Sequence, residues 1–334
     1  MVSMKEIAKQ CNVSVATVSK ALNGYSDIGE ETKNYILRTA SEMGYLPNSS
    51  ARALKTKRTF NLGVLFVDEA RSGLTHDYFN RVLESFKSTA EAKGYDITFT
   101  SGNVSGKRMT YLEHCRYRGV DGVVMACVDF TAEEVQELLL SDIPVVTIDH
   151  ICDGRISVVS NNIQGMEELV TYIYKKGHRK IAYVGTLLAT ESITDRYFGY
   201  QKALLELGLE QKKEWVLDDR HIETGKIDTV NMLQLPKDMP TAFVCNCDLT
   251  ASLLIKKLKE NGYRVPEDIS VVGFDNYLYP GLSDIRITTY EVDMGEMARR
   301  AIHNMIKKIT SDNFKGGVTV VEGRLVLKDS VSHV

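Results

Sequence analysis

The feature that most constrains the fold is an alternation of apolar, strand-like runs with amphipathic, helix-like runs between residues 61 and 327. The strand-like runs are residues 62–67, 96–100, 122–127, 144–149, 181–185, 269–275 and 320–327. The helix-like runs are residues 79–93, 131–140, 162–176, 195–207 and 294–309. Parallel strands are buried on both faces and are joined through helices. The alternation therefore predicts parallel sheets covered by helices, with too many units for one compact sheet.

The N-terminal segment has a different pattern, in which two short helices flank a sharp turn. Residues 5–10 and 14–22 have helical periodicity, and Cys11-Asn12-Val13 lies between them. Such a turn needs a residue that tolerates the left-handed conformation, which Asn12 does, and a small residue such as Ala8 where the helices cross. A third helix is predicted to end before Gly44 and Pro47. It spans residues 30–43, with Ile36, Leu37, Ala40 and Met43 facing inward.

The helix over residues 14–22 would present short side chains and one cation to solvent. Ser14 is its predicted N-cap, and Val18, Ala21 and Leu22 have inward spacing. The outward residues are Val15, Ala16, Thr17, Ser19 and Lys20. Methyl groups of this kind can meet the thymine methyl in a major groove, and a Lys ammonium can meet guanine acceptors. The pattern predicts a DNA-reading head.

The charge distribution favours the same interpretation. The net charge of the chain is only -3. Residues 1–59 nevertheless contain nine Lys and Arg against five acidic residues, so the rest of the chain is acidic. A basic head on an acidic body suits contact with phosphate, although an excess of this size can also arise by chance.

Composition argues against several other classes of protein. The chain is 43% hydrophobic, its apolar runs are too short to span a membrane, and no signal-like segment precedes the head. We expect a cytoplasmic protein whose six scattered cysteines are reduced thiols. The segment 102–108 lacks the spacing and the Ser or Thr of a phosphate loop, and Cys245-Asn246-Cys247 has no second pair at metal-ligand spacing. We therefore expect no enzyme activity, no metal and no cofactor.

Residues 48–57 contain too few apolar side chains to fold alone. They look like a hinge that becomes helical only on DNA, where two copies can support each other. The alternative is a solvated linker.

The motifs that identify a family are Ile7-Ala8, Val13-Ser14-Val15-Ala16-Thr17-Val18-Ser19-Lys20-Ala21-Leu22-Asn23, Gly44-Tyr45-Leu46-Pro47-Asn48 and Ala51-Arg52-Ala53-Leu54. With them, the whole chain resembles the lactose repressor/galactose repressor (LacI/GalR) family of transcription regulators. Two positions depart from the family pattern, which usually has Arg at Lys20 and Ser at Gly29. Lys lacks the fork that reads guanine bidentately, so base choice at that position is expected to be looser.

The resemblance implies an α/β chain with an all-α helix-turn-helix head and two doubly wound parallel-sheet subdomains of the type I periplasmic-binding-protein kind. It implies a head over residues 1–46, a hinge over 47–59, and an effector-binding and dimerisation core over 60–334. The first subdomain would take residues 60–160 and 291–319, and the second would take residues 161–290 and 320–334. The chain has no heptad tail after its last strand, so we expect a homodimer and not a tetramer.

The resemblance also implies which residues touch double-stranded operator DNA. Val15, Ala16 and Lys20 would read bases, and Ser14, Thr17, Ser19, Asn23 and Tyr45 would support contacts to the backbone. In the hinge, the family positions are Asn48, Ala51, Leu54 and Lys55, with Leu54 as an apolar wedge in the minor groove.

An effector site is expected where strands end. Asp149 and Asp275 end apolar strands, Arg196 opens a helix, and Tyr78 and Phe79 open another. Carboxylates and a guanidinium bind adjacent hydroxyls, and an aromatic face covers a sugar ring. Each residue also has a duller explanation, as a cap, a surface charge or a core residue. Because all of them match family effector positions, the resemblance implies a sugar or sugar derivative in the cleft.

Four further positions bear on effector identity. Asn246 belongs to this group, while Cys247 stands where relatives have a ligand-binding Asn. Arg220-His221 stands where relatives often have an aromatic lid, which suggests an anionic effector such as a sugar phosphate. Two rival functions remain open. One is a regulator controlled by a phosphocarrier protein partner, and the other is a sugar-binding protein with a vestigial head.

Overall fold

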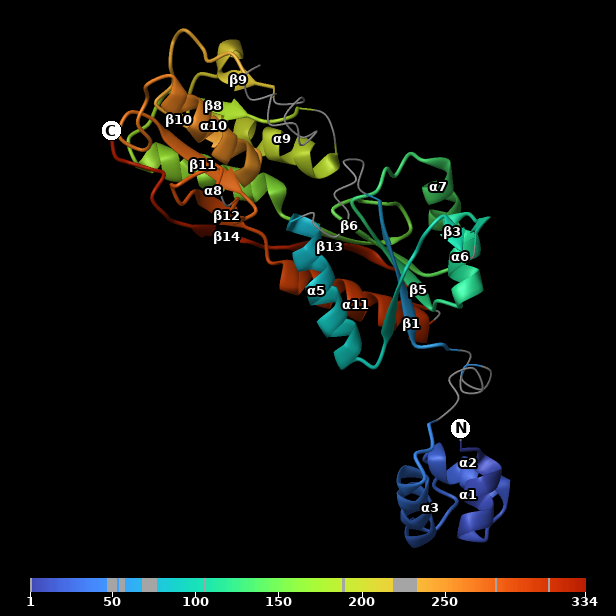
Figure 1. The fold of residues 1–334 in the computed structure, drawn as a ribbon. Helices are drawn as coiled ribbons and strands as arrows, with labels where there is room; N and C mark the ends of the chain where they lie inside the picture. The colour runs from blue at the N-terminus through green and yellow to red at the C-terminus, as the bar shows by residue number, and fades with distance from the viewer. Residues whose placement is uncertain are drawn as a thin grey trace. The chain divides into compact units, whose positions relative to one another are not determined.

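The computed structural model describes residues 2–46, 53, 58–67, 77–104, 106–187, 190–218, 233–279, 281–311 and 313–334. The chain divides into two compact units, Met1–Thr59 and Phe60–Val334, which we call the head and the body. Each is described by itself (Figure 1). Within these ranges, none of the helices has both the length and the apolar character that a membrane span requires.

The helices of the head whose bounds the structure describes are α1 (Met4–Cys11), α2 (Val15–Leu22) and α3 (Glu30–Glu42). A capping box begins α1, because the Ser3 side chain accepts a hydrogen bond from the Glu6 N–H and the Glu6 side chain accepts one from the Ser3 N–H. Asn12 has a φ of 52°, which is the left-handed conformation predicted for the turn. Ser14 caps α2 as predicted, since its Oγ accepts a hydrogen bond of 3.0 Å from the Thr17 N–H.

The core of the head is small but fully formed. Ile7, Val18 and Ile36, one from each helix, are 0% exposed. The prediction that Leu37 faces inward is wrong, because its side chain is 38% exposed. Successive helical residues are about 100° apart around the axis, so Ile36 and Leu37 cannot both face a core this narrow.

The first sheet of the body has the strand order β13-β7-β6-β5-β1-β2, and its strands are parallel. They are β1 (Asn61–Phe66), β2 (Asp96–Phe99), β5 (Gly122–Ala126), β6 (Val145–Ile148), β7 (Ile156–Ser160) and β13 (Gly317–Val321). Val64 belongs to the apolar cluster that contains residues of α5 (Asp77–Ala92) and α11 (Met294–Thr310). Its neighbour Leu65 belongs to the cluster that contains residues of α6 (Tyr111–Arg118) and α7 (Glu133–Leu139). Helices therefore cover both faces, as predicted.

The second sheet repeats this plan in the order β14-β12-β11-β10-β8-β9, and only β14 is antiparallel to its neighbour. Its strands are β8 (Ile181–Val184), β9 (Val216–Leu217), β10 (Ala242–Cys245), β11 (Ser270–Phe274), β12 (Thr288–Glu291) and β14 (Arg324–Val326). Val244 clusters with residues of α8 (Asn162–Lys175) and α9 (Glu191–Glu206). Phe243 clusters with residues of α10 (Asp248–Glu260) on the opposite face.

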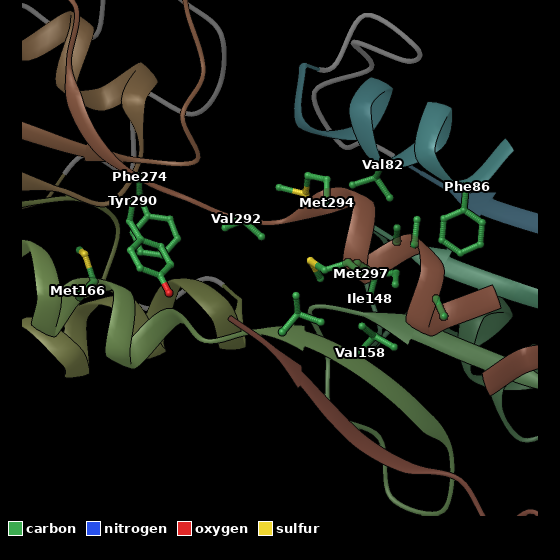
Figure 2. Packing of buried hydrophobic residues seen from close by; sticks show 14 of the residues in the cluster. Val82, Phe86, Ile148, Val158, Met166, Phe274, Tyr290, Val292, Met294 and Met297 are labelled. Carbon is green, nitrogen blue, oxygen red and sulfur yellow. The ribbon is translucent and has the colours of Figure 1, made fainter. Parts of the chain in front are cut away.

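We call each sheet with its helices a subdomain, and the described chain passes between the two after β7, β12 and β13. The second passage is apolar, since Val292 and Met294 are only 4% and 8% exposed. Figure 2 shows Val292 and Met294 between Tyr290 and Val82, so that one apolar cluster continues from the second subdomain into the first.

The prediction of one strand over residues 320–327 is wrong, because this stretch contributes to both sheets. β13 ends at Val321 in the first sheet, and β14 begins at Arg324 in the second. The third passage therefore follows Val321, whereas the sequence placed it near residue 319. Gly323 permits the close approach at this point, since a Cβ there would lie 2.3 Å from the Glu291 carbonyl oxygen. The break coincides with Glu322-Gly323-Arg324, which separates two short apolar runs.

Candidate functional site

The outward face of α2 is the first candidate site. Val15 is 42% exposed, and Ala16 and Lys20 are also exposed, whereas Val18 and Ala21 are buried. The side chains predicted to read bases therefore reach solvent on one face of the helix, and the opposite face holds α2 in the head.

Some of the residues predicted to support contacts to the DNA backbone also make hydrogen bonds at the two ends of α2. The hydroxyl oxygens of Ser14 and Thr17 lie 2.8 Å apart, and Asn23 Nδ2 donates to the Ser19 carbonyl oxygen at 2.5 Å. Tyr45 is half-buried against the core of the head. The remaining predicted DNA contacts, Asn48, Ala51, Leu54 and Lys55, lie outside the described residues.

Lys20 has a partner that the sequence did not indicate. Its Nζ lies 2.5 Å from Asp27 Oδ2, and the two side chains are 49% and 54% exposed. Asp27 belongs to the segment between α2 and α3. The hydrogen bond from Lys20 lowers the pKa of the Asp27 carboxyl, so this group is a carboxylate beside the reading face.

The second candidate site lies in the body, where the side chain of Arg196 connects several strand ends. Its Nε donates to Asn162 Oδ1 at 2.9 Å, and one terminal nitrogen donates to the Asn246 carbonyl oxygen at 2.7 Å. The two terminal nitrogens also reach Asp275 Oδ1 and Oδ2, at 2.9 and 3.3 Å. The guanidinium lies over the Phe274 ring, 3.9 Å from its centroid. The structure thus brings together Arg196, Asn246 and Asp275.

Charge balance keeps this buried guanidinium ionised. Arg196 is 8% exposed, and burial by itself would lower its pKa. The ion pair with Asp275 outweighs burial and raises the pKa, with smaller contributions from Cys247 and Asp149. Asp149 belongs to the first subdomain, whereas Asp275 belongs to the second.

The backbone is unusual at these strand ends. Asp149 follows β6 with a φ of 52°, Asp275 follows β11 with a φ of 96°, and Cys127 follows β5 with a φ of 52°. Residues other than glycine rarely adopt positive φ, and such positions concentrate at ligand sites. Asp149 is held there by its own Oδ1, which accepts hydrogen bonds of 3.0 and 2.7 Å from the Ser160 N–H and hydroxyl.

The structure describes the predicted effector residues to different degrees. Asn246 is 2% exposed and contributes its main-chain oxygen to Arg196, while its side-chain Oδ1 has no hydrogen-bond partner among the described residues. The prediction that Arg196 opens a helix is wrong, because α9 begins at Glu191 and Thr190 caps it. α5 begins at Asp77, but the side chains of Tyr78 and Phe79, and all of Arg220, lie outside the described residues.

Sequence reasoning missed two buried members of the cluster. Asn162, at the start of α8, binds Arg196 directly. Asp248, at the start of α10, is 1% exposed, and its Oδ2 accepts a hydrogen bond of 2.6 Å from the Tyr277 N–H. Burial and the nearby Asp275 raise the pKa of Asp248 well above its ordinary value. Both residues follow strands, so the strand-end rule that pointed to Asp149 and Asp275 was sufficient to find them.

Contacts on two sides of the cluster bridge the subdomains. On one side, an Arg81 terminal nitrogen from α5 donates to the Asn276 carbonyl oxygen at 3.2 Å, and the guanidinium lies 4.9 Å from the Tyr277 ring centroid. On the other side, the Ile151 N–H donates to Glu191 Oε2 at 2.8 Å. These pairs are far apart in sequence, and no local signal predicts them.

The groups set aside in the sequence have the following arrangement where the structure describes them. The described residues contain no group of three or more His, Cys, Asp or Glu that could hold a metal ion. The set-aside segment contains the short strands β3 (Asn103–Val104) and β4 (Lys107–Arg108), which pair with each other antiparallel. All six cysteines are free of disulfide bonds in the structure.

A head with an exposed helix-turn-helix face, joined to a body whose two subdomains bring polar strand ends together, defines the class of ligand-responsive DNA-binding regulators. Residues 3–48 match the family model of bacterial regulatory proteins of the lacI family, and residues 170–331 match a periplasmic binding protein-like domain.

Similar proteins agree with this class. The chain is 32% identical over 342 residues to the HTH-type transcriptional regulator RegA of Clostridium saccharobutylicum, covering 98% of each chain. It is 29% identical to the HTH-type transcriptional repressor PurR of Pectobacterium carotovorum, covering 99% of this chain and 97% of that one. The lac repressor dimer bound to operator and the anti-inducer ONPF has the same fold, with a TM-score of 0.76 at 22% identity and 99% coverage of each chain. The chain belongs to the LacI family of transcription regulators, and the resemblance found in the sequence is confirmed.

Proposed function

We propose that this protein is a cytoplasmic repressor that binds a palindromic operator as a homodimer and is controlled by a neutral, hydroxyl-rich ligand, a sugar or sugar derivative. The observation that carries the proposal is the buried Arg196–Asp275 cluster, on the same chain as a complete reading head. Its relatives are regulators, which supports a regulator and not an enzyme.

The condition of the head supports DNA binding over a vestigial role. Ile7, Val18 and Ile36 are fully buried, and α1 and α2 keep their side-chain caps. A vestigial head would not be expected to retain both this core and an outward face of short side chains. Val15, Ala16 and Lys20 would read bases from that face, with Ser14, Thr17, Ser19, Asn23 and Tyr45 near the backbone.

The chemistry of the cluster favours a neutral ligand over an anion. Asp275 already neutralises the positive charge of Arg196. The pair still offers carboxylate acceptors and directional N–H donors, which suit vicinal hydroxyl groups. Asp149 would contact the same ligand from the first subdomain. A sugar phosphate remains the second candidate, and it would depend on Arg220.

The bridging contacts support a mechanism for control. A ligand held by both subdomains changes the balance between open and closed arrangements only if it binds one of them more tightly. Arg81 and Glu191 already make polar contacts across the boundary between the subdomains, and these contacts would stabilise the closed arrangement. In a dimer, this movement would change how well two heads fit one operator.

DNA binding is tested by fluorescence anisotropy with a labelled duplex from the region upstream of the gene. We expect one dimer per site, and affinity that falls steeply as salt rises. Equal affinity for an unrelated duplex at every salt concentration contradicts the proposal.

Ligand binding is tested by isothermal titration calorimetry with a panel of neutral sugars and the corresponding sugar phosphates. A neutral sugar should bind the wild type, and Asp275→Asn should weaken that binding because it removes the negative charge and replaces one carboxylate acceptor with an amide donor. Binding restricted to the phosphates overturns the neutral-ligand assignment and favours Arg220 as the anion contact.

A further inference from the structure

Asp27 stands beside the one charged residue of the reading helix. Within the sequence of α2, Lys20 is the single ionisable side chain. Its ammonium contacts Asp27 at 2.5 Å, and both side chains are about half exposed. A carboxylate from a separate segment therefore extends the surface that α2 presents.

The contribution of this pair to folding is small, because exposed ion pairs are weakened by water and salt. Its effect on geometry is larger. A Lys ammonium is a rotating point charge with three donors, unlike the fixed fork of Arg. The carboxylate accepts one of these donors and leaves two, so the bound ammonium acquires a direction.

We propose that Lys20 and Asp27 form a composite reader of one G·C base pair; this inference rests on the proposed DNA-binding function. In the major groove, guanine offers two neighbouring acceptors, N7 and O6, and the paired cytosine offers its N4 amine beside them. Lys20 would donate to the guanine acceptors, and Asp27 would accept from the cytosine amine. An A·T pair places the thymine O4 acceptor where the carboxylate would be, and the two repel.

Asp27 also opposes binding to the wrong sequence. A carboxylate near the groove is repelled by phosphates, and it meets a compensating donor only where the correct amine is present. Asp27 therefore lowers affinity for random DNA and raises discrimination at one position in each half-site.

The test is selection of binding sites from a random duplex library by the full-length protein, followed by anisotropy titrations on the selected site. The variants are Asp27→Asn, Asp27→Glu and the matched control Glu42→Gln, which removes the same charge from an exposed ion pair at the end of α3. The wild type should enrich G·C at one position in each half-site. Asp27→Asn should reduce that preference about five- to ten-fold and leave the other positions unchanged, while Asp27→Glu should retain part of it.

A second readout is affinity for random-sequence DNA. Asp27→Asn should increase it and should steepen its dependence on salt, and Glu42→Gln should do so less. The inference is overturned if Asp27→Asn keeps the wild-type preference at every position or behaves like Glu42→Gln. If the wild type itself enriches no sequence, the proposed DNA-binding function fails, and the inference fails with it.

Discussion

The head and the body each contain a basic side chain paired with an aspartate, and the two pairs differ mainly in burial. Lys20 and Asp27 are 2.5 Å apart with side chains 49% and 54% exposed. Arg196 and Asp275 are 2.9 Å apart with side chains 9% and 20% exposed. The groups of an exposed pair can add contacts to a base edge at little cost, whereas a buried pair loses hydration and must stay matched. Burial therefore decides whether an ion pair of this kind contacts a binding partner or fixes the geometry of a pocket.

The number of bonds reinforces this difference. The guanidinium of Arg196 is held by Asn162, Asn246 and Asp275 and lies over Phe274. Its orientation is therefore fixed before a ligand arrives, which reduces the entropy lost on binding. Lys20 has one bonded partner in the described part of the head, Asp27, and keeps two donors for another molecule.

The largest effect is expected from Arg196→Met, which breaks the buried pair. Asp275 would be left as an unmatched, mostly buried carboxylate, which typically costs ~3–5 kcal/mol. Urea unfolding of the full chain measures this loss. The matched control is Arg286→Met, because Arg286 makes the same bidentate contact to Asp329 with both side chains more than half exposed. Equal losses in the two variants contradict the role assigned to burial.

A smaller effect on the free energy of unfolding is expected from Asp248→Asn. This variant tests whether the buried Asp248 carboxyl, which lies near Asp275, lacks a matching cation. The folded-state pKa of Asp248 is raised above its ordinary 3.8, so its stabilising effect is complete below that pH and is lost as pH rises through the folded pKa. Asparagine does not titrate and keeps an acceptor for the Tyr277 N–H.

Urea unfolding between about pH 5 and about pH 8 checks this sign. The variant should gain stability relative to the wild type as pH rises. The opposite results are a difference in the free energy of unfolding between the variant and the wild type that stays constant, or a variant that loses stability relative to the wild type as pH rises. Either result means that Asp248 is ionised and matched in the folded protein.

Features of the fold and of the candidate sites could be predicted from the sequence where they depend on residues close together in the chain, and less well where they depend on distant segments. The turn at Asn12, the cap at Ser14 and the layered sheets follow from local signals and were predicted correctly. The strand-end rule pointed to Asp275 and Asn246 as neighbours of Arg196, because parallel strands end at a common edge. The contacts of Lys20 with Asp27 and of Arg81 with Asn276 depend on how separate segments pack. The division of residues 320–327 between two sheets was visible in part, because Glu322-Gly323-Arg324 interrupts the apolar run. Which sheet each half joins depends on how separate segments pack.

A third prediction concerns Arg81, an exposed side chain that contacts the opposite subdomain and so combines features of both pairs. Arg81→Gln should leave global stability nearly unchanged but weaken ligand binding about two- to ten-fold, because one net hydrogen bond of ~0.5–1.5 kcal/mol that favours the closed arrangement is lost. Calorimetry with the bound sugar measures the effect. Arg299→Gln, which loses a contact to Glu296 within α11, is the control. Equal losses of affinity in the two variants mean that the bridging contact has no part in closure.

The smallest effect on folding is expected from Lys20→Met, which breaks the exposed pair. Unfolding should be nearly unchanged, because water solvates Asp27 once the ammonium is gone. Affinity for the selected operator should nevertheless fall about ten-fold, because two donors to guanine are lost. Lys9→Met removes the same charge from the last turn of α1 and should weaken binding to all sequences evenly, without a change in base preference. If Lys20→Met destabilises the protein as strongly as Arg196→Met, exposure does not separate the two pairs. If it weakens operator binding no more than Lys9→Met does, Lys20 contributes only charge, and the reading role assigned to the pair is wrong.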